Sequence, residues 1–458
     1  MDIMEGTTSK NFSFLSMIRK YVTSSVLLIF ATVLALVFAN LPVVKDFYFS
    51  TLQLPVSFSL GGFNFFSHHG EALTLIQVIN DFLMALFFLS VGLEIKREML
   101  VGELSSPKKA LLPIIGACGG MIVPVLFFRM VCPSDPDMMR GMAIPMATDI
   151  AFSLGVLSIF GKRVPVGLKV FLATLAVADD LGGIIVIALF YSTGVNLLYL
   201  GLAAACVLIL IVGNRFNLRA PIFYLGIGLI LWFMMLNSGI HATIAGVILA
   251  FCVPANLHNG TDYYIERIRR NIGAFPSYEV DHKNNTVILN KDELNLLKSI
   301  ESSADHLISP LQNLEDNLQV PVNFCIIPIF AFANAGIDFS EMAFNSLCEG
   351  VGLAVVLGLV IGKFLGVLSF SWIAVKAKFV SMPKGANWAS LASVCMLCGI
   401  GFTVSMFLAD LSYSPLGETG TELLDQAKLG ILCGTVIAAL LGYLLLNKTL
   451  PKGEAESE

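Results

Sequence analysis

Charged residues are scarce in this sequence. Only 13% of its 458 residues are Asp, Glu, Lys or Arg, whereas soluble globular proteins carry roughly 25%. Apolar residues make up 56% of the chain, and the mean hydropathy is +0.81. A soluble core cannot bury this much apolar surface, so the composition argues against a soluble globular protein and favours an integral membrane protein.

Cysteine motifs that could bind a metal are also sparse. Cys395 and Cys398 form a C-x-x-C within an apolar stretch, without a second such pair or a nearby histidine. A metal or redox site would need these further ligands, so we expect the two cysteines to be small packing residues. We expect no cofactor.

Twelve apolar segments are long enough to cross, or nearly cross, a hydrocarbon core of ~30 Å. The first, which follows Arg19 and Lys20, could be a cleaved signal peptide, but it is long for that role, and we take it as a membrane span. The sequence thus predicts an all-α integral membrane protein of about twelve helices in one domain, 1–458. The segments are 24–41, 73–93, 110–131, 141–161, 166–191, 195–212, 220–236, 239–255, 320–336, 351–375, 388–408 and 429–446.

The placement of positive charge supports this count. If the chain threads the membrane at each segment, 23 of the 28 Lys and Arg residues fall on one side and four on the other. Cytoplasmic loops of membrane proteins carry such an excess of Lys and Arg. We therefore expect a multi-pass protein of the bacterial inner membrane with cytoplasmic N- and C-termini. The one long polar stretch, 256–319, is then a cytoplasmic loop between helices 8 and 9, and a regulatory or partner-binding insert is the alternative.

Three ionisable residues of segments five and ten lie at mid-span, where charge is costly and usually functional. Asp179 and Asp180 are adjacent in segment five, so repulsion and desolvation both disfavour the doubly charged pair. Hard cations such as Na⁺ and Li⁺ prefer oxygen ligands. The pair can therefore hold either protons or a transported cation. Lys363 is the one Lys or Arg residue that falls in neither set of loops. It lies mid-span in segment ten and is the expected counter-ion of the aspartate pair.

Two segments contain polar or glycine-rich interruptions at mid-span. These are Thr148 and Asp149 in segment four, and Gly399, Gly401 and Thr403 in segment eleven. Such interruptions indicate broken helices, whose ends expose backbone dipoles at the midplane. Asp149 would neutralise exposed N-termini, and Lys363 would neutralise exposed C-termini. Helices 3–5 and 10–12 start on opposite sides with the break in the middle helix, which predicts an inverted-topology repeat.

Further titratable residues lie nearer the predicted membrane surfaces. Glu94, Arg97 and Glu98 share one helix face at the cytoplasmic end of segment two, and Glu315 could join them. These residues would form either an ordinary interfacial cluster or a network that senses cytoplasmic pH. His241, at the outer end of segment eight, is more typical of a packing residue.

Several motifs resemble the NhaA family of sodium/proton antiporters, in the same order from about segment one to segment twelve. Inverted repeats with broken helices are known for that family. The motifs are Phe-Phe-Leu-Ser-Val-Gly-Leu-Glu-Ile-Lys-Arg-Glu (87–98), Ala-Thr-Asp-Ile-Ala-Phe (147–152), Ala-Asp-Asp-Leu-Gly (178–182), Ser-Gly-Ile-His-Ala-Thr (238–243), Phe-Ala-Phe-Ala-Asn-Ala-Gly (330–336), Ile-Gly-Lys (361–363) and Gly-Ile-Gly-Phe-Thr (399–403).

The resemblance implies roles for individual residues. Asp179 and Asp180 match the ion-binding pair, with Asp180 the direct ligand, and Lys363 matches the essential lysine. Asp149 matches the acid beside the broken helix. The pH-sensing residues of the family match Glu94, Arg97, Glu98, Glu315 and His241. Two departures bear on the pH response: the long 256–319 stretch, and Asn237 where the family has a basic residue.

The function expected from these residues is electrogenic exchange of Na⁺ or Li⁺ for protons, with two protons per sodium ion, by alternating access. Such a carrier would serve cytoplasmic pH and sodium homeostasis. It is not an enzyme, and its expected partners are membrane lipids, sodium ions and protons, with a homodimer left open and no nucleic acid. A sodium/solute symporter is the alternative within the same class. An intramembrane aspartyl protease would need its aspartates on separate helices, and a cation channel conflicts with a buried Lys363.

Overall fold

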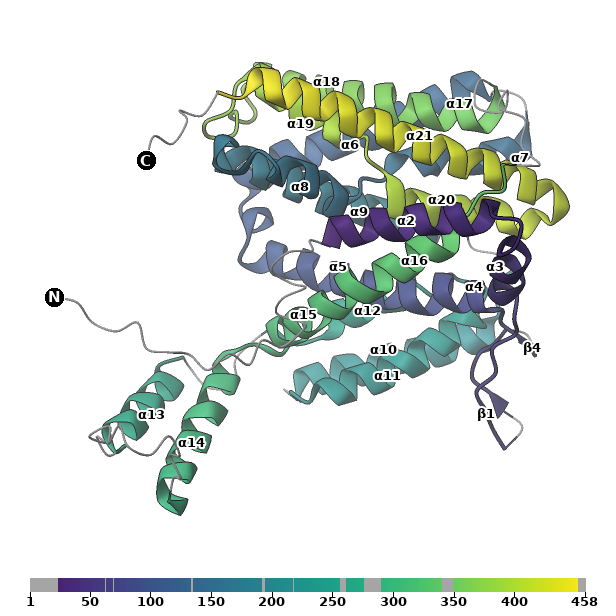
Figure 1. Cartoon of the computed structure of the whole chain (residues 1–458). Helices are drawn as coiled ribbons and strands as arrows, with labels where there is room; N and C mark the ends of the chain where they lie inside the picture. Colours follow the sequence, from purple (N-terminus) through teal and green to yellow (C-terminus); the bar gives the residue numbers. More distant parts are fainter. Residues whose placement is uncertain are drawn as a thin grey trace, which may run out of the picture.

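The computed structural model describes residues 24–451 except 62, 69, 133–134, 192–193, 217, 256–260, 276–289 and 340–348, so Arg19 and Lys20 lie outside the described residues. The described chain is almost entirely helical (Figure 1). Its α-helices are α2 (Ser24–Asn40), α3 (Lys45–Leu52), α4 (Leu75–Val78), α5 (Met84–Leu100), α6 (Pro107–Val131), α7 (Pro136–Met139), α8 (Ile150–Ser158), α9 (Val166–Phe190), α10 (Leu197–Arg215), α11 (Pro221–Leu236), α12 (Ile244–Cys252), α13 (Thr261–Gly273), α14 (Lys291–Leu307), α15 (Pro310–Pro321), α16 (Ile327–Asn334), α17 (Gly350–Leu357), α18 (Lys363–Lys376), α19 (Trp388–Leu397), α20 (Phe402–Tyr413) and α21 (Glu418–Thr449).

Shorter elements join or interrupt these helices. Single π-helical turns continue helices at η1 (Ile79–Leu83), η5 (Val322–Ile326) and η7 (Gly358–Gly362). The 3₁₀ turns are η2 (Glu103–Ser105), η3 (Arg140–Met146), η4 (Gly161–Arg163) and η8 (Ser414–Leu416). Two short antiparallel hairpins pair β1 (Ser59–Leu60) with β2 (Phe63–Asn64), and β3 (Ser67–His68) with β4 (Glu71–Ala72).

Seven helices in the described part of the chain are long and apolar enough to cross a membrane, and up to ten are if each bent helix pair counts as one span. The predicted multi-pass helical architecture is therefore confirmed, while the number twelve stays a prediction. The difference lies in α11, which has 16 residues, and α12, which has nine. Both fall short of the roughly 20 residues that span a bilayer unaided.

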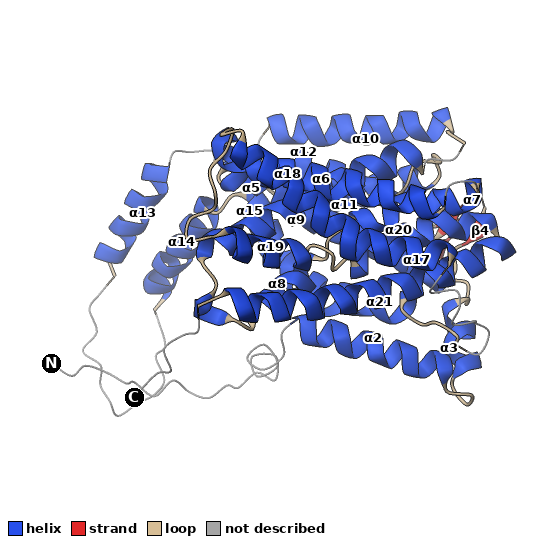
Figure 2. Cartoon of the chain, turned by 90° about the horizontal axis from the view of Figure 1, so that it is seen from above, coloured by secondary structure: helices blue, strands red, loops and turns tan. Residues whose placement is uncertain are grey.

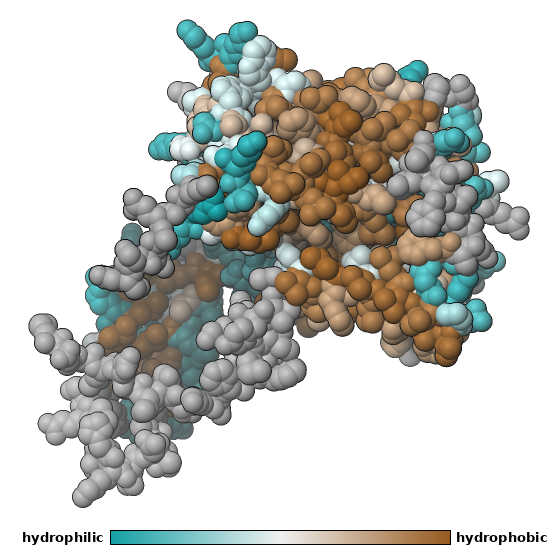
Figure 3. All heavy atoms as spheres, turned by 45° about the horizontal axis from the view of Figure 1, so that its top comes forward, coloured by the Kyte–Doolittle hydropathy of each residue, from teal (hydrophilic) through white to brown (hydrophobic). Residues whose placement is uncertain are grey.

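The long helices run side by side through the body of the molecule (Figures 1 and 2). A broad apolar band covers the face seen in Figure 3, with polar residues gathered at its two ends. The large exposed apolar side chains include Leu208 and Ile211 of α10, and Leu440 and Leu444 of α21. Exposed apolar area on this scale fits a lipid environment and would be a liability in water.

Close backbone approach fixes the centre of this bundle. A Cβ atom on Gly119 of α6 would clash with the carbonyl oxygen of Gly366 on α18, and the reverse clash would follow a Cβ on Gly366. Small residues at a crossing allow membrane helices to pack tightly without a hydrophobic driving force between them. This contact holds α18, which begins at Lys363, against α6.

The predicted polar loop 256–319 contains helices wherever the structure describes it. The helices α13 and α14 pack against each other and project from the bundle (Figure 1). Asn290 caps α14 by accepting hydrogen bonds from the backbone of Asp292 and Glu293. The helix that contains the ninth apolar segment begins at Pro310, about three helical turns before residue 320.

Candidate functional site

Two bent helix pairs meet at the centre of the bundle. The pair formed by η3 and α8 bends by 41° at residues 147–149, and α19 and α20 bend by 44° at residues 398–401. The two breaks satisfy each other's backbone: the Asp149 N–H donates to the Ile400 carbonyl at 2.7 Å. Irregular backbone at membrane depth is tolerated where protein groups satisfy it in this way.

Glycine is required at the second break because neighbouring backbone approaches closely. A Cβ on Gly399 would clash with the carbonyl oxygen of Leu359, and one on Gly401 would lie 2.8 Å from Leu359 Cδ2 and 3.1 Å from the carbonyl oxygen of Ala147. Leu359 belongs to η7, the π turn that leads into Lys363. The glycines therefore let the break lie directly against the helix that carries the lysine.

Asp149 joins the N-termini of two half-helices. Its Oδ1 accepts the Phe152 N–H at 2.9 Å, at the start of α8. Its Oδ2 accepts the Thr403 N–H at 3.1 Å and the Thr403 hydroxyl at 2.7 Å, at the start of α20. A buried carboxylate in this position satisfies unpaired donors of both helices and faces the positive ends of their dipoles.

Lys363 is fully buried, and its ammonium lies at the C-terminal end of a half-helix. Its ammonium Nζ is 2.7 Å from Asp179 Oδ2 on α9. It also donates to the carbonyl oxygen of Met146, the last residue of η3. The cation therefore contacts both a carboxylate and the negative end of a half-helix, as expected for a buried charge that must be paired.

The Thr148 hydroxyl completes the surroundings of Asp179. It lies 2.8 Å from Asp179 Oδ2 and 2.9 Å from the carbonyl oxygen of Cys398, and can donate its single proton to either. Because Cys398 ends the first half of the second bent pair, one hydroxyl connects both breaks to α9.

Asp180 differs from its neighbour in having no fixed partner. Its side chain is 2% exposed, and neither carboxylate oxygen has a hydrogen-bond partner among the described residues. It lines a cavity of about 380 Å³, here called the site cavity, together with Thr148, Asp149 and Thr403. Burying a bare carboxylate is costly, so this residue calls for a proton or a cation.

The site cavity supplies oxygen atoms, which suit hard cations. The described residues contain no group of three or more His, Cys, Asp or Glu side chains that could hold a resident metal ion. The cavity extends to the exposed residues Ser158 and Gln319, which gives solvent a way in. The cavity therefore places oxygen ligands within reach of solvent.

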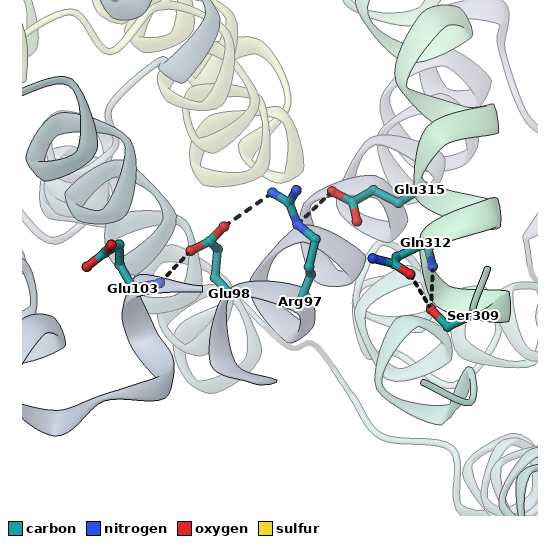
Figure 4. A network of polar contacts seen from close by, with 6 residues as sticks. All are labelled: Arg97, Glu98, Glu103, Ser309, Gln312 and Glu315. Atoms are coloured by element: carbon teal, nitrogen blue, oxygen red, sulfur yellow. Dashed lines mark hydrogen bonds and ion pairs between the residues drawn. The ribbon is translucent and has the colours of Figure 1, made fainter. Parts of the chain in front are cut away.

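A charged cluster lies where the end of α5 faces α15 (Figure 4). The Arg97 guanidinium is 3.2 Å from Glu98 Oε1 and 3.2 Å from Glu315 Oε1 on α15. Glu98 Oε2 in turn accepts the Glu103 N–H at 3.0 Å. Glu94 itself lines the site cavity. The structure thus brings the four predicted residues to one place and links α5 to α15.

His241 is not part of that cluster. Its Nε2 lies 2.7 Å from the carbonyl oxygen of Tyr191, which follows the end of α9. The Tyr191 hydroxyl donates to the Arg140 carbonyl at 2.7 Å. The eleven residues from Asp180 to Tyr191 correspond to roughly 16 Å along a helix, so His241 contacts neither Asp180 nor the charged cluster.

A second buried polar network was missed by reasoning from the sequence. Asn80 of η1 forms hydrogen bonds with both Asn334 of α16 and Asp410 of α20, which are distant in the chain. The available signal was that each residue interrupts an otherwise apolar stretch. That signal gives no information about which helices would bring them together.

Comparison with known proteins gives one consistent result. The family described as Na+/H+ antiporter 1 matches residues 16–446. A relative from Bacteroides fragilis named Na(+)/H(+) antiporter NhaA is 52% identical over 94% of this chain and 96% of its own length. Relatives with the same name from Phocaeicola vulgatus and Porphyromonas gingivalis are 51% and 44% identical, with at least 95% of each chain covered.

The contact between Lys363 and Asp179 predicts thermodynamic coupling. Lys363→Ala leaves a buried carboxylate without its cation, which should cost about 3 kcal/mol. A second change, Asp179→Asn, removes that charge and should recover part of the loss. A double-mutant cycle in the melting temperature of the purified protein measures the coupling.

The exposed pair Glu266 and Arg270 of α13, 3.8 Å apart, provides the control. Its cycle should give a coupling near zero because solvent screens both charges. If the coupling between Lys363 and Asp179 were as small as that between Glu266 and Arg270, the proposed pairing would be contradicted.

Proposed function

Because the chain belongs to the Na+/H+ antiporter 1 family, we propose that it is a secondary transporter that exchanges sodium or lithium ions for protons. The observation that carries this proposal is the buried, unpartnered Asp180 carboxylate at the inner end of the site cavity. The relatives' printed name supports sodium and protons as the exchanged ions.

In this proposal, Asp180 is the direct ligand of the ion, and Asp179 is the second acid of the pair. Lys363 holds Asp179 in place when the cation is absent. When sodium arrives, it replaces protons on the carboxylates, since both compete for the same oxygens. Thr148 and Thr403 line the cavity close by and can supply neutral oxygen ligands.

The broken helices make the site polar and compensate the dipoles that they expose. Asp149 offsets two N-terminal dipoles and Lys363 offsets a C-terminal one, so the ion meets few uncompensated backbone charges. Gly399 and Gly401 allow the required close packing. The matching bends of η3–α8 and α19–α20 support an origin from an inverted repeat of helices 3–5 and 10–12.

We propose that the site faces one side of the membrane at a time. Exchange of two protons for one sodium ion would move net charge, so the membrane potential would drive it. With cytoplasmic termini in the bacterial inner membrane, sodium would leave the cell as protons enter. This direction serves sodium and pH homeostasis.

The cluster of Glu94, Arg97, Glu98 and Glu315 is the proposed pH sensor. It lies beside the site cavity and joins α5 to α15 through ion pairs that depend on the charge of the glutamates. Protonation of Glu315 would release Arg97, and the two helices could then shift. His241 would act through the end of α9 instead.

Asp180→Asn should abolish sodium-driven proton release from proteoliposomes while the protein still inserts. The amide nearly preserves volume but removes both the charge and the titratable proton. Asp137→Asn, the same change at an exposed surface position, serves as the control and should exchange normally. Full exchange by the Asp180→Asn protein would overturn the assignment of the ion site.

Competition predicts how sodium affinity depends on pH. Below the pH at which the carboxylates release their protons, the KM for sodium should increase about tenfold for each unit by which the pH is lowered, and for each proton displaced. Above that pH the KM should level off. Measurements of KM and kcat across pH in proteoliposomes check this. A KM that stays constant while kcat alone changes would indicate a separate proton path.

If the cluster senses pH, a change in one of its residues should shift the pH at which transport becomes active. Glu315→Gln weakens the link to Arg97 and should move the activity–pH curve with little change in maximal rate. An exposed glutamate of α14 provides the control, since Glu301→Gln should leave the curve in place. A loss of maximal rate at every pH, without a shift, would place Glu315 in the ion path or the fold.

A further inference from the structure

A second and larger cavity lies on the other side of the site. Its volume is about 780 Å³, and it reaches exposed residues such as Gln77 and Thr421. Asn80 and Asp410 line it, and no residue that lines it also lines the site cavity. The two cavities therefore approach the centre of the bundle from different directions.

Three helices pass between these cavities, and each carries the same order of side chains. A residue at the site cavity is followed by a buried phenylalanine and then by a member of the polar network. The order is Thr403, Phe407 and Asp410 on α20; Ile327, Phe330 and Asn334 on α16; and Val91, Phe88 and Asn80 on α5 and η1.

The phenylalanines form a layer that closes the path. Phe88, Phe330 and Phe407 are each no more than 2% exposed and belong to one hydrophobic cluster. The rings of Phe88 and Phe407 have their centroids 5.6 Å apart. Apolar side chains of this kind exclude water and ions, and Asp180 lines the site cavity but not the second cavity.

The polar network lies on the second-cavity side of that layer. Asn80 Nδ2 donates to Asp410 Oδ2 at 2.8 Å and to Asn334 Oδ1 at 3.1 Å. Asn334 Nδ2 donates back to Asn80 Oδ1 at 2.8 Å and to the Phe330 carbonyl at 3.0 Å. All four amide protons are used, and a fully satisfied buried network favours one geometry.

The network also joins two sets of helices. The helix α20 packs mainly against η3 and α21, whereas α16 packs mainly against α2 and η5, with smaller contacts of α16 with η1 and with α20. The bond from Asn80 to Asp410 crosses between these sets. Ser414 also donates to Asp410, at 2.6 Å, but from the neighbouring turn of the same chain segment.

We propose that Asn80, Asn334 and Asp410 are positioning residues that form a latch, which holds the second-cavity side of the transport path closed. The proposal rests on the alternating access described above. For the site to face the second cavity, the phenylalanine layer must part, and the Asn80–Asp410 bond must break first or with it. Loosening the latch therefore favours the state open to the second cavity.

The latch is tested first without transport. Asp410→Leu removes the acceptor at similar volume, and Asp410→Asn keeps an acceptor oxygen. Hydrogen exchange of the purified protein should become faster in residues 330–334 and 407–413 of the leucine variant. Ser414→Ala is the matched control, because it removes a bond to Asp410 that does not cross between the helix sets. Unchanged exchange in the leucine variant, or equal acceleration in the control, would overturn the latch.

Transport provides the second readout. Sodium is presented to oriented proteoliposomes from each side, and the two KM values are compared. Asp410→Leu should change their ratio roughly tenfold, by tightening the KM on the second-cavity side and weakening the other. Asp410→Asn and Ser414→Ala should keep the wild-type ratio. A wild-type ratio in the leucine variant, or a change in the opposite direction, would refute the gating role.

The two readouts separate this inference from the proposed function. If the wild-type protein moves no sodium, the proposed exchange fails, while the hydrogen-exchange comparison still decides whether the latch exists. Should Asp410→Leu fail to fold, Asn80→Leu replaces it, because it removes the same crossing bond from the other helix. Its expected effects on hydrogen exchange and on the KM ratio are the same.

Discussion

The contact of the Lys363 ammonium with Asp179 and the Met146 carbonyl is the constraint on which the site depends. An unpaired charge at this depth would be prohibitively costly. The lysine therefore requires a carboxylate on α9 and a helix end pointing at it, and both are present. Because the cation satisfies Asp179, its neighbour Asp180 is the acid left open to the cavity. The asymmetry of two adjacent aspartates thus follows from one buried cation.

The broken helices follow from the same requirement. A continuous helix has no free carbonyl to offer Lys363 and no free N–H groups to offer Asp149. The breaks in segments four and eleven lie side by side and supply both the free carbonyl and the free N–H groups. Hydrogen bonds between the two breaks then satisfy several of the backbone groups that they expose. Glycine at 399 and 401 removes the side chains that would otherwise keep these backbones apart.

Much of this arrangement could be predicted from the sequence, because a charge in an apolar segment stands out. Asp179, Asp180, Lys363 and the two interruptions were found in this way. The contact of Glu315 with Arg97 could only be suggested from the sequence. The first turns of α15 are polar, so hydropathy places the start of this helix too late. The Asn80–Asn334–Asp410 network could not be assembled, because its bonds join residues at least 254 positions apart and depend on how the helices cross.

The three π turns have an evolutionary consequence. A π turn is equivalent to one extra residue inserted into an α-helix, and η1, η5 and η7 contain or directly precede Asn80, Asn323 and Lys363. A deletion from a regular stretch of α-helix would rotate all that follows by about 100°, whereas a deletion within one of these wide turns would close it into a regular helix and leave the flanking turns facing as before. The three turns are therefore the places where these helices can change length by one residue and keep the rest of the helix in register.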